Sequence, residues 1–201
     1  MKDINATVIV DLTPSEQEIL DNLHKDARWG INRAKRDGLS VEESDDWSEF
    51  YHIYEQTMKE GEAKASSLEN LRNNTKKLFI CKKDGKIIAG AGIWFVDIYN
   101  KDIPRLYFNA SLKEYQSSQP NNLLYWSCIL WAKKEGYKEF DLGGWQINAR
   151  GNLEGINKFK EKWGKVVHFK KNYATHKAIG RKLVRNSGFF WWLNKKLKGN
   201  K

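Results

Sequence analysis

The sequence predicts an α+β fold in which a central, mixed and mostly antiparallel sheet is flanked by helices. At 201 residues the chain has the length of a single domain. Its first part has helical apolar spacing, and its middle part has successive strand patterns, two of them joined by Asp84-Gly85. This dipeptide is typical of tight hairpin turns. The last part alternates helix and strand patterns, which completes a sheet with helices packed on it.

The N-terminal segment predicts a strand followed by a long amphipathic helix. Residues 5–12 read as the opening strand, and Thr13, Pro14 and Glu16 suggest a helix start with Thr13 as its N-cap. Gly30 interrupts the helical pattern, so we expect two helical pieces that meet there. The apolar residues that recur at helical spacing are Ile19, Leu20, Leu23, Ala27, Ile31 and Ala34.

The next segment predicts two more helices. A helix begins near Asp46 and carries Trp47, Phe50, Tyr54 and Met58 on one face. Residues 60–67 are polar and contain glycine, so they form a loop, and a further helix is expected over residues 68–77.

The middle of the chain predicts a three-stranded meander. Residues 78–82 and 86–96 form the hairpin, and residues 105–112 form the next strand. The junction over residues 114–122 contains no glycine, and Pro120 lacks a backbone N–H. The helix over residues 122–136 is apolar nearly all round in its first two turns, so it should be central and buried.

The segment from residue 139 to residue 171 contains the most informative pattern. A short strand, residues 139–142, ends at the glycine pair Gly143-Gly144. A short helix follows, in which Ile156, Phe159 and Trp163 form one apolar stripe and Lys160 falls on that same stripe. A lysine on a buried stripe is costly unless it is paired or lines a polar cleft. The alternative is a lysine whose stem packs while its head reaches water.

Residues 165–175 predict a last strand, and residues 180–201 form a separate basic and aromatic segment. We therefore assign residues 1–179 to one domain and residues 180–201 to a C-terminal helix or tail. The tail composition suits either an interfacial helix on an anionic membrane or a helix docked on the domain with a basic outer face.

The charge of the chain favours a polyanionic partner. Thirty-five Lys and Arg residues against 25 Asp and Glu residues give a net charge of +10, which suits tRNA, a nucleotide diphosphate or an anionic membrane. The alternative is simple solubility. Arg28, Arg33, Lys35 and Arg36 form a basic cluster, which either clamps phosphates or is a solvated helix face.

Several motifs resemble the Fem (FemABX) family of aminoacyl-tRNA-dependent peptidyltransferases. These are Asp141-Leu142-Gly143-Gly144 followed by Gly155, Phe159-Lys160 and Trp163-Gly164, the segment 23–39 around Arg28-Trp29, and the segment 122–137. The resemblance covers most of the chain and implies an acetyltransferase-like (GNAT) fold. It implies transfer of an amino acid from aminoacyl-tRNA to a peptidoglycan precursor or another small amine acceptor. Family members commonly carry two such domains, so a shared precursor surface is either missing here or supplied by a partner domain or a second copy.

The resemblance also implies roles for individual residues. Lys160 corresponds to a lysine that helps to bind the tRNA 3′ end and stabilises the transition state, and Phe159 packs beside it. Asp141 either orients the amine, pairs with Lys160 or is a buried structural carboxylate. The motif match adds Trp29, Gly143 and Gly144 to the substrate-binding set. Lys64 lies in a loop that borders the acceptor site in related enzymes, and it is either an acceptor contact or merely solvated. The substrate-binding candidates are therefore Arg28, Trp29, Arg33, Lys35, Arg36, Lys64, Gly143 and Gly144.

Other site types find no support in the sequence. The four histidines are isolated, and no metal-ligand spacing or Ser-His-Asp arrangement is present. Direct attack by the amine is therefore favoured over a covalent intermediate. Cys81 and Cys128 lie in apolar contexts and read as buried thiols. No signal-peptide pattern or transmembrane-length apolar run is present, so we expect a cytoplasmic protein, with the membrane contact of the tail left open.

Two alternative functions stay open. The first is an acyl-CoA-dependent N-acyltransferase of the same fold. Acetyl-CoA-dependent members usually hold the pyrophosphate on a glycine-containing loop before the central helix, so the glycine-free junction makes acetyl-CoA the less favoured donor. We expect no cofactor other than aminoacyl-tRNA as co-substrate. The second alternative is a non-catalytic module that binds tRNA or membrane.

Overall fold

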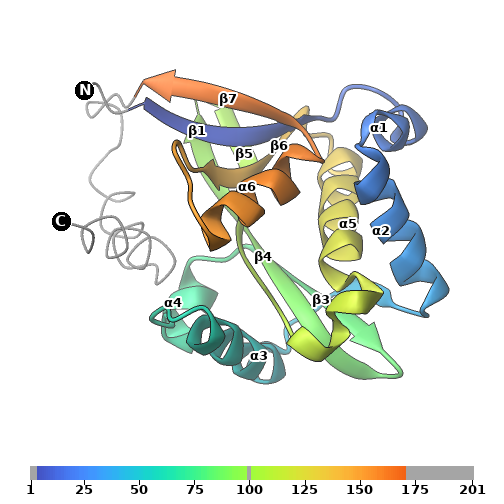
Figure 1. The fold of residues 1–201 in the computed structure, drawn as a ribbon, viewed down its shortest axis with the longest axis vertical. Coiled ribbons are helices and arrows are strands. Elements are labelled where there is room, and N and C mark those ends of the chain that lie inside the picture. The colour runs from blue at the N-terminus through green and yellow to red at the C-terminus, as the bar shows by residue number, and fades with distance from the viewer. Residues whose placement is uncertain (1–3, 99–100, 171–201) are drawn as a thin grey trace.

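The computed structural model describes residues 4–98 and 101–170, which form one mixed sheet with helices on both faces (Figure 1). The seven strands lie in the order β2-β3-β4-β5-β6-β1-β7. The predicted fold class is therefore confirmed. The later part of the predicted last strand, up to residue 175, and the basic tail at residues 180–201 lie outside the described residues.

The N-terminal elements are β1 (Ile4–Asp11), α1 (Glu16–Asn22) and α2 (Lys25–Arg36). The predicted Thr13 cap is wrong: Thr13 bonds back to Asp11, and Ser15 caps α1 in a capping box with Glu18. The break between the helices falls at Leu23 and His24, which are the C-cap of α1 and the N-cap of α2. Gly30 lies inside α2, so the predicted interruption there is also wrong.

A short edge strand, β2 (Ser40–Glu43), precedes the next helices and was not predicted from the sequence. The two helices are α3 (Trp47–Glu60), which begins near Asp46 as predicted and has Asp46 as its N-cap, and α4 (Leu68–Asn73). The α4 helix is shorter than expected because Lys77 already begins β3.

The meander and the C-terminal elements follow the predicted order. They are β3 (Lys77–Lys83), β4 (Lys86–Ile98), β5 (Lys101–Ser111), the 3₁₀ helix η1 (Lys113–Ser118), α5 (Pro120–Lys134), β6 (Glu139–Trp145), α6 (Asn152–Glu161) and β7 (Lys165–Lys170).

Two apolar cores hold the helices on the sheet. One contains α2, α5 and one face of strands β1, β3, β4 and β6, and its fully buried residues include Phe140, Leu124 and Ile129. The other lies under α3 and α4, around Phe50. The predicted burial of the helix that begins at Pro120 is confirmed, since nine of its residues are buried.

Strands β5 and β6 form the one parallel pair of this sheet within the described part of the chain. A single residue pair, Arg105 with Asp141, joins them in register. Beyond that pair the two strands lack registered partners in each other, and α6 lies in front of β6 at this place (Figure 1). The candidate site is built around this junction.

Candidate functional site

Lys160 lies on the buried side of α6, as its place on the apolar stripe predicted. Only 6% of the residue is exposed, so its head does not reach water as a snorkelling lysine would. Its Nζ donates a hydrogen bond of 3.0 Å to the backbone carbonyl of Gly144. Burial lowers the pKa of Lys160 to about 8; the negative charge of Asp141 opposes this lowering, and the positive charge of Arg105 adds to it.

The glycine pair of β6 shapes the place where this ammonium group lies. Gly143 has φ of +77°, a conformation that side-chain-bearing residues rarely adopt. A Cβ atom there would lie 3.1 Å from the Leu106 carbonyl oxygen and 3.6 Å from Lys160 Nζ. Gly143 therefore lets the strand turn its next carbonyl, that of Gly144, toward Lys160.

Asp141 is fully buried directly behind this turn. Its carboxylate accepts hydrogen bonds from the Gly143 N–H at 2.7 Å and from the Thr7 hydroxyl. Arg105 donates to the other carboxylate oxygen from Nε at 2.8 Å and from Nη2 at 2.5 Å. The direct partner of Asp141 is thus Arg105, and its effect on Lys160 acts through space.

Sequence reasoning missed Arg105 and Thr7. The available signal was an arginine within the strand pattern RLYFNASL, which calls for a partner if it is buried. The sequence does not name that partner, because Asp141 lies 36 residues away. Arg105 has 22% of its side chain exposed, so its side chain lies between the buried Asp141 carboxylate and the solvent.

Phe159, the neighbour of Lys160 on α6, contacts an aromatic side chain of α5. Its ring centroid lies 5.0 Å from that of Tyr125 and 6.1 Å from that of Trp163. It also lines a cleft of about 330 Å³ between α2, the start of α5 and the end of α6. The other lining residues are Asp26, Trp29, Gln119, Asn122 and Lys162.

The structure divides the predicted basic cluster. Arg28 donates to the carbonyls of Asp21, at 2.6 Å, and Leu23, at 2.5 Å. Arg28 therefore caps the end of α1, and its contact with substrate phosphates stays a prediction. Arg33 pairs with Asp37 at 3.0 Å.

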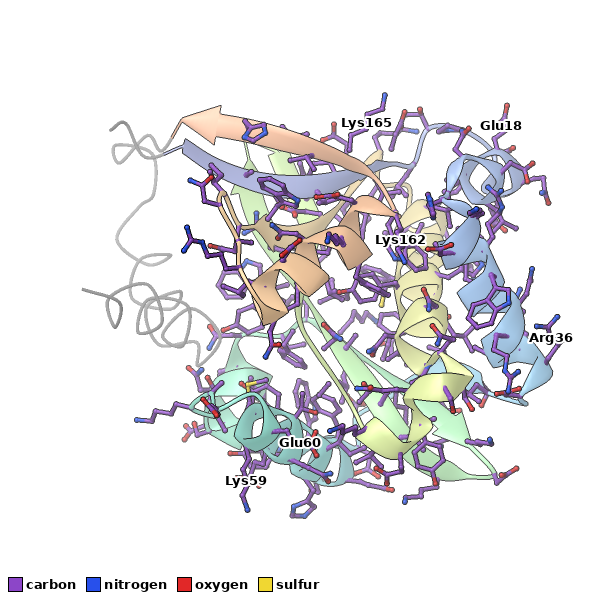
Figure 2. The ribbon with its side chains drawn as sticks, in the orientation of Figure 1. Glu18, Arg36, Lys59, Glu60, Lys162 and Lys165 are labelled. Atoms are coloured by element: carbon purple, nitrogen blue, oxygen red, sulfur yellow. The ribbon has the colours of Figure 1, made fainter. Side chains whose placement is uncertain are left out.

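The other predicted contacts lie on the surface. Lys35 and Arg36 are exposed, and Figure 2 shows Arg36 at one end of α2 and Lys162 beside the other end. Lys64 is exposed on the loop between α3 and α4. That loop borders α6, because Ala63 packs against Leu153.

The junction before α5 is built without glycine, as the sequence indicated. Residues Lys113–Ser118 form η1, Gln119 takes a left-handed φ of +61°, and Pro120 begins α5. The Asn122 N–H is already bonded to the Gln119 carbonyl at 3.1 Å. Few backbone N–H groups therefore remain here for an anion.

The described residues carry neither a metal cluster nor a membrane span. Over residues 4–98 and 101–170, no three His, Cys, Asp or Glu side chains gather as a metal site. In the same residues, no helix has the length and apolar character that crossing a bilayer requires.

Comparison with known proteins gives one family and several similar structures. The model of the acetyltransferase (GNAT) domain matches residues 22–161. The structure is similar to that of FemX, with a TM-score of 0.71 and 15% identity over 83% of this chain and 60% of that one. Comparison with curated proteins gives no match.

Two further solved structures are similar to this one. One is the C-terminal domain of a putative lysylphosphatidylglycerol synthetase from Agrobacterium fabrum, with a TM-score of 0.61 and 17% identity over 92% of this chain and 66% of that one. The other is L-PGS from Bacillus licheniformis, with a TM-score of 0.56 and 17% identity over 98% of this chain and 66% of that one. This chain spans less than two thirds of each of these three proteins. The family match covers most of the sequence, and the chain belongs to the acetyltransferase (GNAT) domain family.

Proposed function

We propose that this acyltransferase moves an amino acid from aminoacyl-tRNA to an amine acceptor such as the peptide of a peptidoglycan precursor. The observation that carries the proposal is the buried Lys160, held on the Gly144 carbonyl beside the junction of β5 and β6. A buried ionisable group with a perturbed pKa is a frequent mark of a functional site. The similarity to FemX and to the lysylphosphatidylglycerol synthetase domain supports aminoacyl transfer as the activity.

The chemistry follows from what an ammonium group can do in such a place. The acceptor amine attacks the carbonyl carbon of the aminoacyl ester, a C–N bond forms, and the C–O bond to the terminal ribose breaks. The amine loses a proton and the released ribose hydroxyl gains one. Negative charge develops on oxygen during this step, and a fixed positive charge in a dry site stabilises it strongly. With a pKa of about 8, Lys160 is mostly protonated at pH 7.

The remaining site residues support Lys160 in this proposal. The turn at Gly143 and Gly144 is held by Asp141, Arg105 and Thr7. The Gly144 carbonyl of this turn then holds the ammonium group of Lys160. Phe159 packs against Tyr125 of α5 and so helps to hold α6 in place.

Acyl transfer from acetyl-CoA is the second candidate function, and the family match favours it. The junction at Gln119 and Pro120 argues against it, because it offers few N–H groups to a pyrophosphate. We therefore propose aminoacyl-tRNA as co-substrate, with no further cofactor.

Partners and location follow from the same proposal. The acceptor is a peptidoglycan precursor or another small amine, and we propose that the protein works in the cytoplasm or peripherally at the inner face of the membrane. Because the chain covers only 60% of FemX, a partner domain or a second copy would supply any acceptor surface that it lacks.

The experiment compares two lysines of the same helix. Lys160→Met and Lys158→Met are assayed with a pool of radiolabelled aminoacyl-tRNAs and precursor peptides bearing a free amine. Lys158 is the matched control, because it is exposed and pairs with Glu154 at 2.6 Å. We expect Lys160→Met to abolish formation of the labelled amide and Lys158→Met to retain it. Full activity in Lys160→Met would show that the assignment is wrong.

A further inference from the structure

A buried asparagine of α6, Asn157, binds the chain where it leaves β6. Its Oδ1 accepts a hydrogen bond of 2.9 Å from the backbone N–H of Gln146, and its Nδ2 donates one of 2.7 Å to the carbonyl of the same residue. Asn157, Leu153 and Lys160 are the buried residues of α6. We infer that Asn157 is a positioning residue, which holds α6 against the end of β6 so that the ammonium group of Lys160 faces the reacting ester. The inference rests on the proposed function for the identity of that reaction.

The paired hydrogen bonds of Asn157 take the place of a neighbouring strand. The register of β6 with β1 ends at Trp145, which lies opposite Ala6, and Gln146 is the next residue. A side-chain amide presents an acceptor and a donor side by side, as the backbone of an adjacent strand does. Gln146 is therefore fixed to α6 at two points, and both of its backbone groups are satisfied by one side chain.

The start of α6 depends on contacts of this kind, because the helix lacks a side-chain cap. Its N-cap is Gly151, with φ of +58°, and this residue has no side chain that could bond to the first helical N–H groups. Farther along the helix, the carboxylate of Glu161 accepts a hydrogen bond of 2.5 Å from the exposed indole N–H of Trp145. Asn157 is 5% exposed, so its bonds are shielded from competing water, whereas this second contact is not.

The position of Asn157 links these bonds to Lys160. The two residues are three apart in a helix, so they project from the same side, and they hold Gln146 and Gly144 of one extended segment. An ammonium group has three N–H donors. Within the described residues one donor binds the Gly144 carbonyl, which leaves two for the oxygen on which negative charge develops.

The direction of those two donors depends on where α6 places the lysine stem relative to Gly144. With Asn157 in place, Lys160 does not have to tether the helix and its head can serve the reaction. Without Asn157, α6 would be held to the end of β6 by the Lys160 bond and by the exposed Glu161 contact. A catalytic group that is displaced by about 1 Å can lose about 100-fold in rate.

The alternative is that Asn157 only stabilises the fold, and Asn74 provides a matched control for it. Asn74 is also a buried asparagine, and its Nδ2 donates 2.7 Å to the Asn70 carbonyl at the end of α4. Asn157→Ala and Asn74→Ala each remove a buried amide that bonds to the backbone, so both should lower the unfolding free energy. Only Asn157→Ala should release α6 from β6.

Two measurements on the full chain test the inference. Steady-state kinetics at pH 7, with the aminoacyl-tRNA pool and the precursor peptides of the assay above, gives kcat and KM. NMR of the chain with 13C-labelled lysine gives the pKa of each ammonium group without any need for activity. The resonance that is absent from Lys160→Met identifies Lys160. Asp141 and Arg105, the charged groups that act on Lys160, are the same in all these variants.

We expect Asn157→Ala to lower kcat about 10- to 100-fold and to change KM much less. The pKa of Lys160, about 8 in the original chain, should rise toward its ordinary value of 10.5, because a loosened helix lets water reach the ammonium group. Asn74→Ala should leave kcat and this pKa unchanged.

A second variant covers the case in which Asn157→Ala does not fold. Asn157→Asp has almost the same size and keeps the acceptor for the Gln146 N–H, and it loses the bond to the Gln146 carbonyl. Lys160 is already mostly protonated at pH 7, so the added negative charge cannot slow the reaction by changing its protonation. We expect kcat of Asn157→Asp to lie below that of the original chain.

Three results would count against the account, and they are distinguishable. An unchanged kcat and an unchanged Lys160 pKa in Asn157→Ala would overturn the positioning role and leave the proposed function intact. An equal loss of kcat in Asn74→Ala would also overturn it, because the loss would then report on stability. A raised Lys160 pKa in Asn157→Ala, in a chain that transfers no amino acid, would keep the placement of Lys160 by Asn157 and overturn the proposed function.

Discussion

Replacing Lys160 by Met should make the protein more stable at neutral pH while removing its activity. The reason is that the fold carries the cost of burying this ammonium group. Lys160 is 6% exposed, and the structure gives its head one backbone carbonyl as hydrogen-bond partner in the described residues. Met has a similar length and no charge, so the variant fills the same space without that cost.

The size of the effect follows from the pKa. Burial lowers the pKa of Lys160 from 10.5 to about 8, which corresponds to about 3 kcal/mol at 1.36 kcal/mol per pH unit. The Met variant also loses the charged hydrogen bond to the Gly144 carbonyl, and this loss lowers its unfolding free energy by about 1 to 2 kcal/mol. The variant should therefore gain about 1 to 2 kcal/mol in unfolding free energy at pH 7.

The stability difference between the two proteins depends on pH, because Lys160 has different pKa values in the folded and the unfolded chain. Below pH 8 the lysine is protonated in both the folded and the unfolded chain, so the folded state bears the whole cost. Between pH 8 and pH 10.5 the folded chain has released the proton while the unfolded chain still holds it, and the original protein gains stability as pH rises. The advantage of Lys160→Met should thus be full at pH 7 and shrink as pH approaches 10.5.

Urea denaturation at pH 7 and pH 10 measures this difference. The original protein, Lys160→Met and the exposed-site control Lys158→Met are compared at each pH, so that titration of the other lysines and tyrosines cancels. A Lys160→Met variant that is less stable at pH 7, or a gap that stays constant between the two pH values, would refute the reasoning.

Three other predictions follow from the same geometry. The transfer rate should fall as pH rises through about 8, because protonated Lys160 is the active form; a pH–rate profile that rises there would instead make the neutral amine the active species. Gly143→Ala should lower stability by about 1 to 3 kcal/mol, because residue 143 has φ of +77° and the Leu106 carbonyl is close. Gly155→Ala should raise stability by up to about 1 kcal/mol, because Gly155 lies in α6 with open space around it. Thermal denaturation compares the two variants. Arg28→Ala should lower stability and leave the salt dependence of tRNA binding unchanged, whereas Arg36→Ala should reduce the slope of log K against log salt by about 0.7 to 0.9. Filter binding at several salt concentrations measures these slopes. A reduced slope in Arg28→Ala would contradict the cap assignment.

Local signals in the sequence predicted much of the fold. The hairpin at Asp84-Gly85 and the start of α3 near Asp46 depend on a few neighbouring residues, and both predictions are confirmed. The start of α1 was misplaced because Thr13 and Ser15 are both good caps. The choice depends on side-chain partners: Thr13 bonds to Asp11, while Ser15 and Glu18 bond to each other.

Non-local packing accounts for what the sequence did not reveal. Edge strand β2 has no apolar alternation of its own, and its Glu42 and Glu43 pair with lysines of β3. In the site, periodicity was enough to place Lys160 on a buried face. It could not reveal that Asp141 binds Arg105, or that Arg28 turns back to cap α1, because both depend on where other elements pack.

Donor identity tests the central claim most directly. The purified chain is incubated with an amine acceptor and, in parallel, with radiolabelled aminoacyl-tRNAs or radiolabelled acetyl-CoA, and acid-stable amide product is counted. We predict label in the product from aminoacyl-tRNA and none from acetyl-CoA. Label from acetyl-CoA alone would contradict the account and make this GNAT domain an acetyltransferase.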